Sequence, residues 1–220
     1  MKDKVAVKSL KATVYDQVVS DVIRGVYKAN DIITENSLIV RFGVSKAPVR
    51  EALIEMCKDS FLKSLPRLGY QVVPCCLSEM VDILDFRVDL ERSNLQRAFS
   101  KLTVADITLL KEKQDSWNKE LPDGTDIFAN WFRNQRFHQF LCSLSGNSYA
   151  YHALEYVLKQ NARFFAQYYS YAWMNDTESK GRYHEQIIDA LENHNLDVAC
   201  DILEKDIGSV KMQLQAIIQH

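Results

Sequence analysis

The sequence predicts a mainly α-helical protein in two parts. An N-terminal winged helix-turn-helix, made of three helices and a β-hairpin wing, is followed by an antiparallel all-helical bundle. Apolar residues recur at helical spacing along most of the chain. Two short runs on either side of residue 67 read instead as strands joined by a tight turn. The chain contains only seven Gly and four Pro, and three of the prolines precede residue 75, which leaves little room for loops after that point.

Composition limits the class of protein. The 220 residues are 47% hydrophobic and 25% charged, as in an ordinary globular protein of one large or two modest domains. No apolar run approaches the roughly 18 residues of a membrane span. No apolar signal segment follows Met1-Lys2-Asp3-Lys4, so a cytoplasmic protein is expected. The five cysteines have no C-x-x-C spacing, which indicates free thiols in a reducing compartment.

Charge is distributed unevenly along the chain. Residues 1–77 contain 12 Lys and Arg against 8 Asp and Glu, whereas residues 78–220 contain 15 against 21. A basic module joined to an acidic one is typical of a nucleic-acid-binding domain attached to a second domain. The imbalance is mild and decides nothing by itself. We expect the domain boundary to separate residues 1–75 from residues 78–220.

Two helices are predicted before the helix that is expected to recognise DNA. Residues 1–10 are lysine-rich and are expected to form an arm that orders on binding. The first helix then runs from about Thr13 to Arg24, where Gly25 is a natural residue to follow a helix. A connector with apolar residues at 32 and 33 leads to a second helix over residues 35–42, which Gly43 ends.

The third helix carries the first functional signal. Ser45 is a good N-cap, and Pro48 falls in the first turn, where a missing N–H costs little. Lys46 and Arg50 share one face with Ala47 beside them, near the positive end of the helix. The opposite face is an apolar stripe of Val49, Ala52, Leu53 and Met56. The pattern fits a helix that enters a DNA major groove, although a surface helix with two ordinary charges would also show it.

The run Phe-Gly-Val-Ser-Lys-Ala-Pro-Val-Arg-Glu-Ala-Leu over residues 42–53, followed by Pro66-Arg67-x-Gly69 in the wing, resembles the GntR family of bacterial transcription regulators. The resemblance covers residues 10–74. It departs at residues 29–30, which are Ala-Asn where the family usually has Pro-Gly, and at residues 59–61, which are Asp-Ser-Phe where Glu-Gly-Leu is usual.

A role in DNA binding follows from this pattern. The predicted DNA-contacting residues lie on the third helix and in the wing: Ser45, Lys46, Ala47, Arg50, Arg67 and Gly69. A single winged module buries too little DNA for tight specific binding. We therefore expect a homodimer that binds a near-palindromic double-stranded operator.

The second half is predicted to be six helices in an antiparallel bundle. The expected helices span about 78–99, 103–121, 125–144, 148–173, 175–192 and 196–218. Asn134 and His138 are four residues apart, which places both on one helix face about 6 Å apart along the axis. His184 begins an apolar stripe, and Asp206 lies beside apolar residues on the last helix. Taken alone, such residues are more often ordinary polar side chains than metal ligands.

The second half contains Phe137-His138-x-x-Leu141, then Ser-Gly-Asn at 145–147, then His184-x-x-Ile187. These motifs resemble the FCD domain, the effector-binding half of FadR-type GntR regulators, in which one Asp and three His often hold a metal. The resemblance implies a ligand set of Asn134, His138, His184 and Asp206. Asn134 stands where the family has Asp, and Asp206 stands where it has the last His. Zinc or nickel would suit the imidazoles, and manganese would tolerate the extra oxygen ligands.

Arg87 matches the Arg-x-x-x-Glu element of the same domain family. The resemblance implies that its guanidinium faces the cavity, where it could grip the carboxylate of a small organic-acid effector. The alternative is a surface ion pair between Arg87 and Glu91, four residues later. Arg163 is a second candidate for effector binding.

The sequence thus predicts a DNA-binding transcription regulator, not an enzyme, whose bundle binds an organic-acid effector with a divalent metal. Two alternatives remain at this stage. One is a metal-dependent all-helical enzyme, against which no acidic residue of the motif is placed as an obvious general base. The other is a DNA-binding regulator with a degenerate, metal-free bundle.

Overall fold

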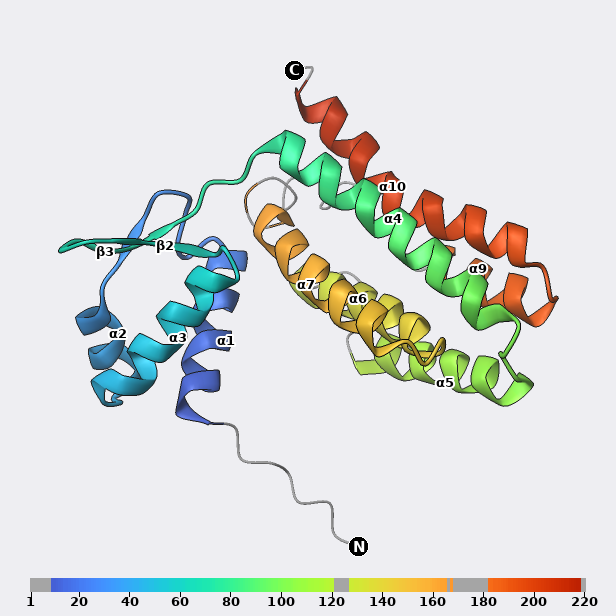
Figure 1. Cartoon of the computed structure of the whole chain (residues 1–220), viewed down its shortest axis with the longest axis horizontal. Helices are drawn as coiled ribbons and strands as arrows, with labels where there is room; N and C mark the ends of the chain where they lie inside the picture. The colour runs from blue at the N-terminus through green and yellow to red at the C-terminus, as the bar shows by residue number, and fades with distance from the viewer. Residues whose placement is uncertain (1–8, 121–126, 166, 168–181, 219–220) are drawn as a thin grey trace, which may run out of the picture. The chain divides into compact units, whose positions relative to one another are not determined.

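The computed structural model describes residues 9–120, 127–165, 167 and 182–218, which form two compact units (Figure 1). One unit comprises residues 1–75 with 162–167, and the other comprises residues 76–161 with 168–220. The fold class predicted from the sequence, a winged helix-turn-helix followed by a helical domain, is confirmed. In the part of the chain that is described, no helix is both long enough and apolar enough to cross a membrane.

Three helices form the body of the first unit: α1 (Leu10–Ile23), α2 (Glu35–Phe42) and α3 (Lys46–Lys58). Helix α1 begins earlier than predicted, because the Ser9 hydroxyl accepts a hydrogen bond from the Ala12 N–H and caps the helix. The last two residues of the predicted arm, Ser9 and Leu10, therefore begin α1, and residues 1–8 lie outside the described part. Helix α2 ends as predicted at Gly43, which adopts a left-handed conformation with φ 62°.

The predicted apolar stripe of α3 is fully buried and packs mainly against α1. Together with a residue of α2, these side chains make a continuous core across the three helices. Its buried members are Val14, Val18, Val22, Ile23, Leu38, Val49, Ala52, Leu53 and Met56. Lys46, Ala47 and Arg50 lie on the exposed side of α3.

A three-stranded antiparallel sheet completes the first unit. Strands β2 (Leu62–Leu65) and β3 (Gly69–Val72) form the predicted hairpin. The predicted connector at residues 32 and 33 is instead a strand, β1 (Ile32–Ile33), which pairs with β3, so the strand order is β1-β3-β2. Two residues are too few to show the alternation that identifies a strand. Because β1 pairs with the second edge of β3, strand β3 of the wing is held on both sides.

The second unit is helical throughout its described residues. Its helices are α4 (Leu77–Phe99), α5 (Val104–Glu120), α6 (Ile127–Ser143), α7 (Ser148–Phe164), α9 (Arg182–Glu192) and α10 (Leu196–Ile218), with the end of α7 grouped in the first unit. The predicted turn at 122–124, the predicted extension of α7 toward residue 173 and the predicted helix start near 175 lie outside the described residues.

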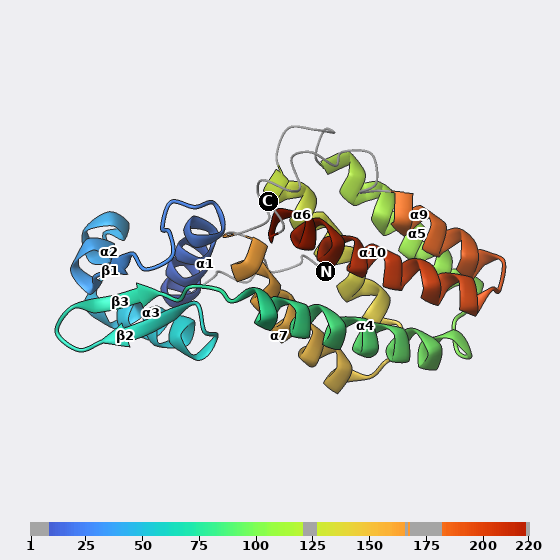
Figure 2. The ribbon, with the colours of Figure 1, turned by 90° about the horizontal axis from the view of Figure 1, so that it is seen from above.

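The two longest helices of this unit, α4 and α10, lie side by side, and α9 packs against both α10 and α5 (Figures 1 and 2). Helix α6 contacts α4 and α5. Most residues between these helices are apolar, but a group of ionisable and polar side chains is buried among them. It includes Arg87, Glu91, His138, His184 and Asp206. This buried polar group is where the sequence placed its candidate ligands.

Candidate functional site

The predicted DNA-contacting residues of α3 lie at its N-terminal end and are exposed. Ser45 occupies the N-cap position as predicted, but its side chain makes no capping hydrogen bond. Its hydroxyl is therefore available to another partner. Lys46 and Arg50 have side-chain exposures of 67% and 63%. Ala47 is exposed beside Lys46 and leaves room for a close approach.

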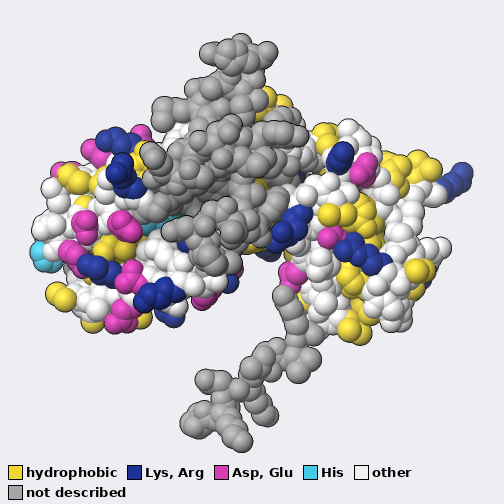
Figure 3. Space-filling view, turned by 180° about the vertical axis from the view of Figure 1, so that it is seen from behind, with side chains coloured by type: hydrophobic (Ala, Val, Ile, Leu, Met, Phe, Trp, Pro, Cys, Tyr) yellow, Lys and Arg dark blue, Asp and Glu magenta, His cyan; other side chains and the backbone are white. Residues whose placement is uncertain are grey.

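The wing brings two further predicted residues to the turn between β2 and β3. Arg67 is exposed there with φ 68°, in the left-handed region. Gly69 has φ 129°, and a Cβ at this position would lie 2.6 Å from the backbone oxygen of Ile33. The absence of a side chain at Gly69 is thus required by the close approach of β1. On the face seen in Figure 3, Lys and Arg side chains are visible on both units, with Asp and Glu side chains among them.

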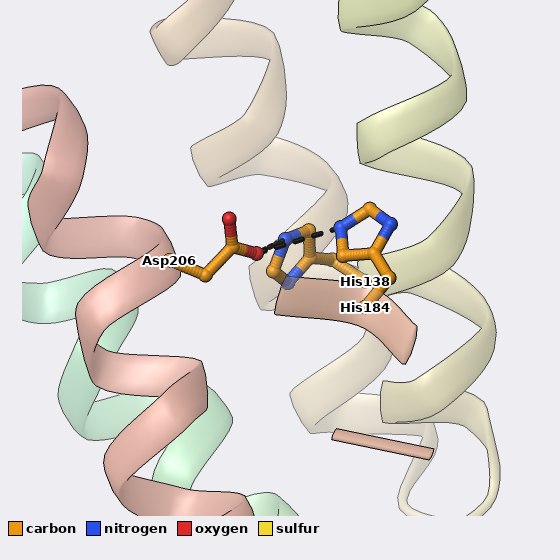
Figure 4. Close-up of side chains that lie close together, drawn as sticks. All are labelled: His138, His184 and Asp206. Atoms are coloured by element: carbon orange, nitrogen blue, oxygen red, sulfur yellow. Dashed lines mark ion pairs between the residues drawn. The ribbon is translucent and has the colours of Figure 1, made fainter. Parts of the chain in front are cut away.

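The second unit brings His138 of α6, His184 of α9 and Asp206 of α10 together (Figure 4). His138 Nε2 lies 3.0 Å and His184 Nε2 lies 3.4 Å from the same oxygen, Asp206 Oδ2. One potential ligand atom from each residue lies within 4.8 Å of the others. The three side chains are buried although they come from three separate helices. The structure therefore brings these three predicted ligands together.

The geometry around Asp206 is not that of a satisfied hydrogen-bonding network. Its buried Oδ2 has no well-formed hydrogen bond among the described residues, although two imidazole nitrogens lie close to it. Burial alone would raise the pKa of Asp206, but the two histidines outweigh it and hold the pKa below its usual value. A buried carboxylate that stays ionised needs a cationic neighbour. A protonated imidazole or a metal ion would meet that need.

Asn134, the fourth predicted ligand, lies at the same place. Its amide Nδ2 is 3.1 Å from His184 Nε2. A half-turn of the amide would present its oxygen there instead. The His184 ring is stacked on Phe137, with ring centroids 3.8 Å apart and planes 11° apart, so its orientation is fixed. Burial lowers the pKa of His184, which favours the neutral imidazole that a metal requires.

Glu91 of α4 is a further functional candidate, beyond the residues predicted from the sequence. Its Oε2 lies 2.6 Å from His138 Nδ1, and its Oε1 accepts a hydrogen bond from Arg87 Nε at 2.5 Å. Burial would raise the pKa of Glu91, but Arg87 and His138 outweigh it and lower the pKa. Because an ionised carboxylate only accepts hydrogen bonds, Nδ1 of His138 donates to Glu91, while Nε2 faces Asp206. Burial alone would lower the pKa of His138, but Glu91 and Asp206 raise it, so a metal would have to displace the Nε2 proton.

Both arginines that the sequence singles out are buried. The alternative of a surface Arg87–Glu91 pair is wrong, because both side chains are at most 6% exposed. Arg87 Nη2 is buried and has no hydrogen-bond partner among the described residues. Arg163 is also buried, but it belongs to residues 162–167, which group with the first unit, and its guanidinium carbon lies 5.8 Å from the Phe164 ring centroid.

Comparison with known proteins connects both parts of the chain to one family. Residues 10–72 match the model for bacterial regulatory proteins of the gntR family, and residues 82–208 match the FCD domain. The HTH-type transcriptional regulator YdhC of Bacillus subtilis is 26% identical over 185 residues, which cover 84% of this chain and 82% of YdhC. The HTH-type transcriptional repressor GlaR of Escherichia coli is 25% identical over 174 residues, which cover 74% and 73%.

The fold agrees with a solved structure. Escherichia coli McbR/YncC superposes with a TM-score of 0.74 at 18% identity, over 96% of this chain and 99% of that one. The relatives are named as transcription regulators and not as enzymes, which removes the alternative of a metal-dependent enzyme. Since the FCD match alone spans more than half of the chain, this protein belongs to the GntR family of DNA-binding bacterial transcription regulators, in the FCD-containing architecture of the FadR subfamily.

Proposed function

We propose that this regulator responds to a small organic acid, which its helical unit binds together with a divalent metal ion, and that the response changes binding to a near-palindromic operator. One observation carries the proposal: Nε2 of His138 and of His184 both face Asp206 Oδ2, a buried oxygen without a well-formed hydrogen bond in the described structure. Two imidazoles and a carboxylate are a donor set for zinc, nickel or manganese.

The residues of the second unit have distinct roles in this proposal. His138, His184 and Asp206 would be the principal ligands, and the amide oxygen of Asn134 would be a fourth. A bound metal would supply positive charge that attracts an anionic effector. Glu91 lies 2.6 Å from His138 Nδ1 and would accept its proton, so that Nε2 would bind the metal once the metal displaces the proton there, and such an outer carboxylate raises the affinity of metal sites.

Arg87 supports the choice of a carboxylate effector. Its Nε is engaged by Glu91, while Nη2 is buried without a partner in the described structure. A buried guanidinium nitrogen without an acceptor is costly, and a carboxylate oxygen would satisfy it with a charge-assisted hydrogen bond. The proposed effector is therefore a small anion that a metal and a guanidinium can hold together.

Metal content tests the proposal directly. Protein purified without chelator and without a nickel column should contain close to one equivalent of zinc, nickel or manganese by elemental analysis. The His138→Ala/His184→Ala double variant should contain almost none. His152→Ala is the matched control, because His152 is a histidine of α7 that is 73% exposed and pairs with Glu155. Sub-stoichiometric metal in the wild type, with no rise in melting temperature on adding any of the three ions, would contradict the metal site.

The proposed operator contacts come from the first unit. Lys46 and Arg50 would reach a phosphate or a guanine edge, Ser45 would donate to a phosphate, Ala47 would allow close approach, and Arg67 would contact DNA from the wing. Gly69 would let the wing turn pass close to the DNA backbone. Their exposure at one end of α3 and at the wing turn supports this assignment. As a transcription regulator, the protein is expected to act in the bacterial cytoplasm as a homodimer.

Arg50→Ala tests the DNA assignment. The change should weaken specific binding by about 1–3 kcal/mol, as loss of a base or charged phosphate contact does. Binding would be measured by fluorescence anisotropy on a duplex that the wild type selects from a randomised library. Lys58→Ala, an exposed charge change at the other end of α3, should leave affinity unchanged. Equal affinity of Arg50→Ala and wild type would remove α3 from its proposed role.

A further inference from the structure

The carboxylate of Glu35 lies between the two cations proposed to read DNA. Its Oε2 is 3.2 Å from Lys46 Nζ, and its Oε1 is 3.8 Å from Arg50 Nε. Glu35 is the first residue of α2, whereas Lys46 and Arg50 are four residues apart on α3. One carboxylate therefore connects the two helices of the helix-turn-helix at the end proposed to face DNA.

Glu35 is itself held in place by the rest of the unit. Tyr70 of β3 donates a hydrogen bond from its hydroxyl to Oε1 at 3.4 Å. Thr34 caps α2, and a carboxylate in the first turn is favoured by the positive end of the helix. The Glu35 side chain is only 22% exposed, whereas Lys46 and Arg50 are 67% and 63% exposed. The anion is thus the fixed partner, and the two cations extend from it toward solvent.

Stability does not explain this arrangement, because ion pairs with such exposed cations contribute little to folding. The negative charge also reduces attraction to every phosphate. The arrangement instead orients the Arg50 guanidinium. A carboxylate beside Nε leaves the terminal Nη pair of Arg50 free, and two N–H groups of a guanidinium can contact guanine O6 and N7 together.

We infer that Glu35 is a positioning residue that determines operator specificity: it orients Arg50 and Lys46 and lowers affinity for DNA of arbitrary sequence. The inference rests on the proposed role of α3 in reading DNA. A free Lys46 would neutralise any phosphate within reach, and a free Arg50 would sample several acceptors. Removal of the Glu35 charge should therefore raise the affinity of the protein for DNA of any sequence. It should also reduce the difference in affinity between the operator and other sequences.

Glu35→Gln in the full chain tests the inference. Affinity would be measured by fluorescence anisotropy, across a salt series, on a duplex selected by the wild type and on a shuffled duplex of equal length. The ratio of the two affinities should fall about tenfold, the size of one good base contact. On the shuffled duplex, the slope of log affinity against log salt should steepen by about one, because one more cation is free for phosphate. Tyr70→Phe should change the ratio in the same direction and by less.

Glu51→Gln is the matched control. Glu51 is an exposed residue next to Arg50, and no ion pair joins it to either cation among the described residues. This variant changes the net charge equally and should keep the ratio. An unchanged ratio in Glu35→Gln, while Arg50→Ala loses specific binding, would overturn the inference and leave the role of α3 intact. If Arg50→Ala also bound normally, the proposed role of α3 itself would fail.

Two further outcomes would also overturn the inference. Equal losses of affinity on both duplexes, with a lower melting temperature, would show that Glu35 only maintains the fold. Loss of preference for a single cytosine, with an unchanged salt slope, would show that Glu35 contacts a base directly.

Discussion

At the residue scale, Glu91 shows what the sequence contained and the prediction overlooked. The buried positions of α4 include Met80, Leu84, Leu95 and Ala98, which recur at helical spacing. Positions 87 and 91 continue that stripe, so the same periodicity places Arg87 and Glu91 inside the bundle. The predicted cavity-facing Arg87 agrees with this register, whereas the alternative of a surface pair gave the charge of the two residues more weight than their register. The contact with His138, 47 residues away, could not be predicted from spacing within one helix.

Glu91→Gln should destabilise the second unit by about 3–5 kcal/mol, because it leaves the buried Arg87 cation without its counter-ion. It should also lower metal affinity about 10–100-fold, since His138 loses the carboxylate that orients it. Urea unfolding followed by tryptophan fluorescence reports on this unit, where Trp117 and Trp131 lie.

The control for this experiment is Asp89→Asn, an exposed carboxylate on the same helix, which should change stability by less than about 0.5 kcal/mol. If Glu91→Gln were as stable as Asp89→Asn and bound metal normally, the contacts from Arg87 through Glu91 to His138 would contribute neither to stability nor to metal binding.

At the element scale, the sequence was most informative where a helix had both a strong apolar stripe and a clear end. Helix α2 between Thr34 and Gly43 is an example, as is the buried stripe of α3. The sequence was least informative for β1, whose two residues become a strand only through pairing with β3, far along the chain. Local signals cannot encode such a partner. The start of α1 was also missed, because its cap residue Ser9 lay in a lysine-rich stretch.

Two capping positions give opposite expectations for stability. Thr34 Oγ1 accepts a hydrogen bond from Ser37 N–H at 3.2 Å, so Thr34→Ala should destabilise the first unit by about 1 kcal/mol. Ser45 makes no such bond, so Ser45→Ala should change stability by less than about 0.5 kcal/mol. If its hydroxyl contacts phosphate, Ser45→Ala should instead weaken operator binding by about 1 kcal/mol. Circular dichroism and anisotropy would show whether stability and binding separate in this way.

Two glycines of the first unit allow a similar comparison. Gly25 has φ 72° with open space around it, so Gly25→Ala should cost about 1 kcal/mol from backbone strain alone. Gly69→Ala adds an overlap with the Ile33 carbonyl oxygen to a comparable strain and should cost about 3 kcal/mol. Amide hydrogen exchange should show the additional loss confined to the β1–β3 pairing. Equal costs for the two variants would mean that β1 does not hold the wing.

At the scale of the whole molecule, the charge asymmetry agrees with two units of different function. The basic excess lies in the unit that matches the gntR family model, and the acidic excess lies in the unit that matches the FCD domain. GntR regulators typically act as dimers, and a dimer has a physical advantage here. Two modules joined in one assembly bind their second half-site as an intramolecular event, which raises the overall affinity without any new contact.

A homodimer on a near-palindrome therefore makes two linked predictions. Light scattering at micromolar concentration should give a mass near twice the 25.4 kDa of one chain. A duplex in which one half of the selected site is randomised should bind about 10²–10⁴-fold more weakly than the intact site, because the linked second contact is lost. Randomising flanking base pairs outside the site is the control and should have no effect. A mass near 25.4 kDa, together with equal binding of half and intact sites, would show that one winged module suffices and that operator symmetry has no role.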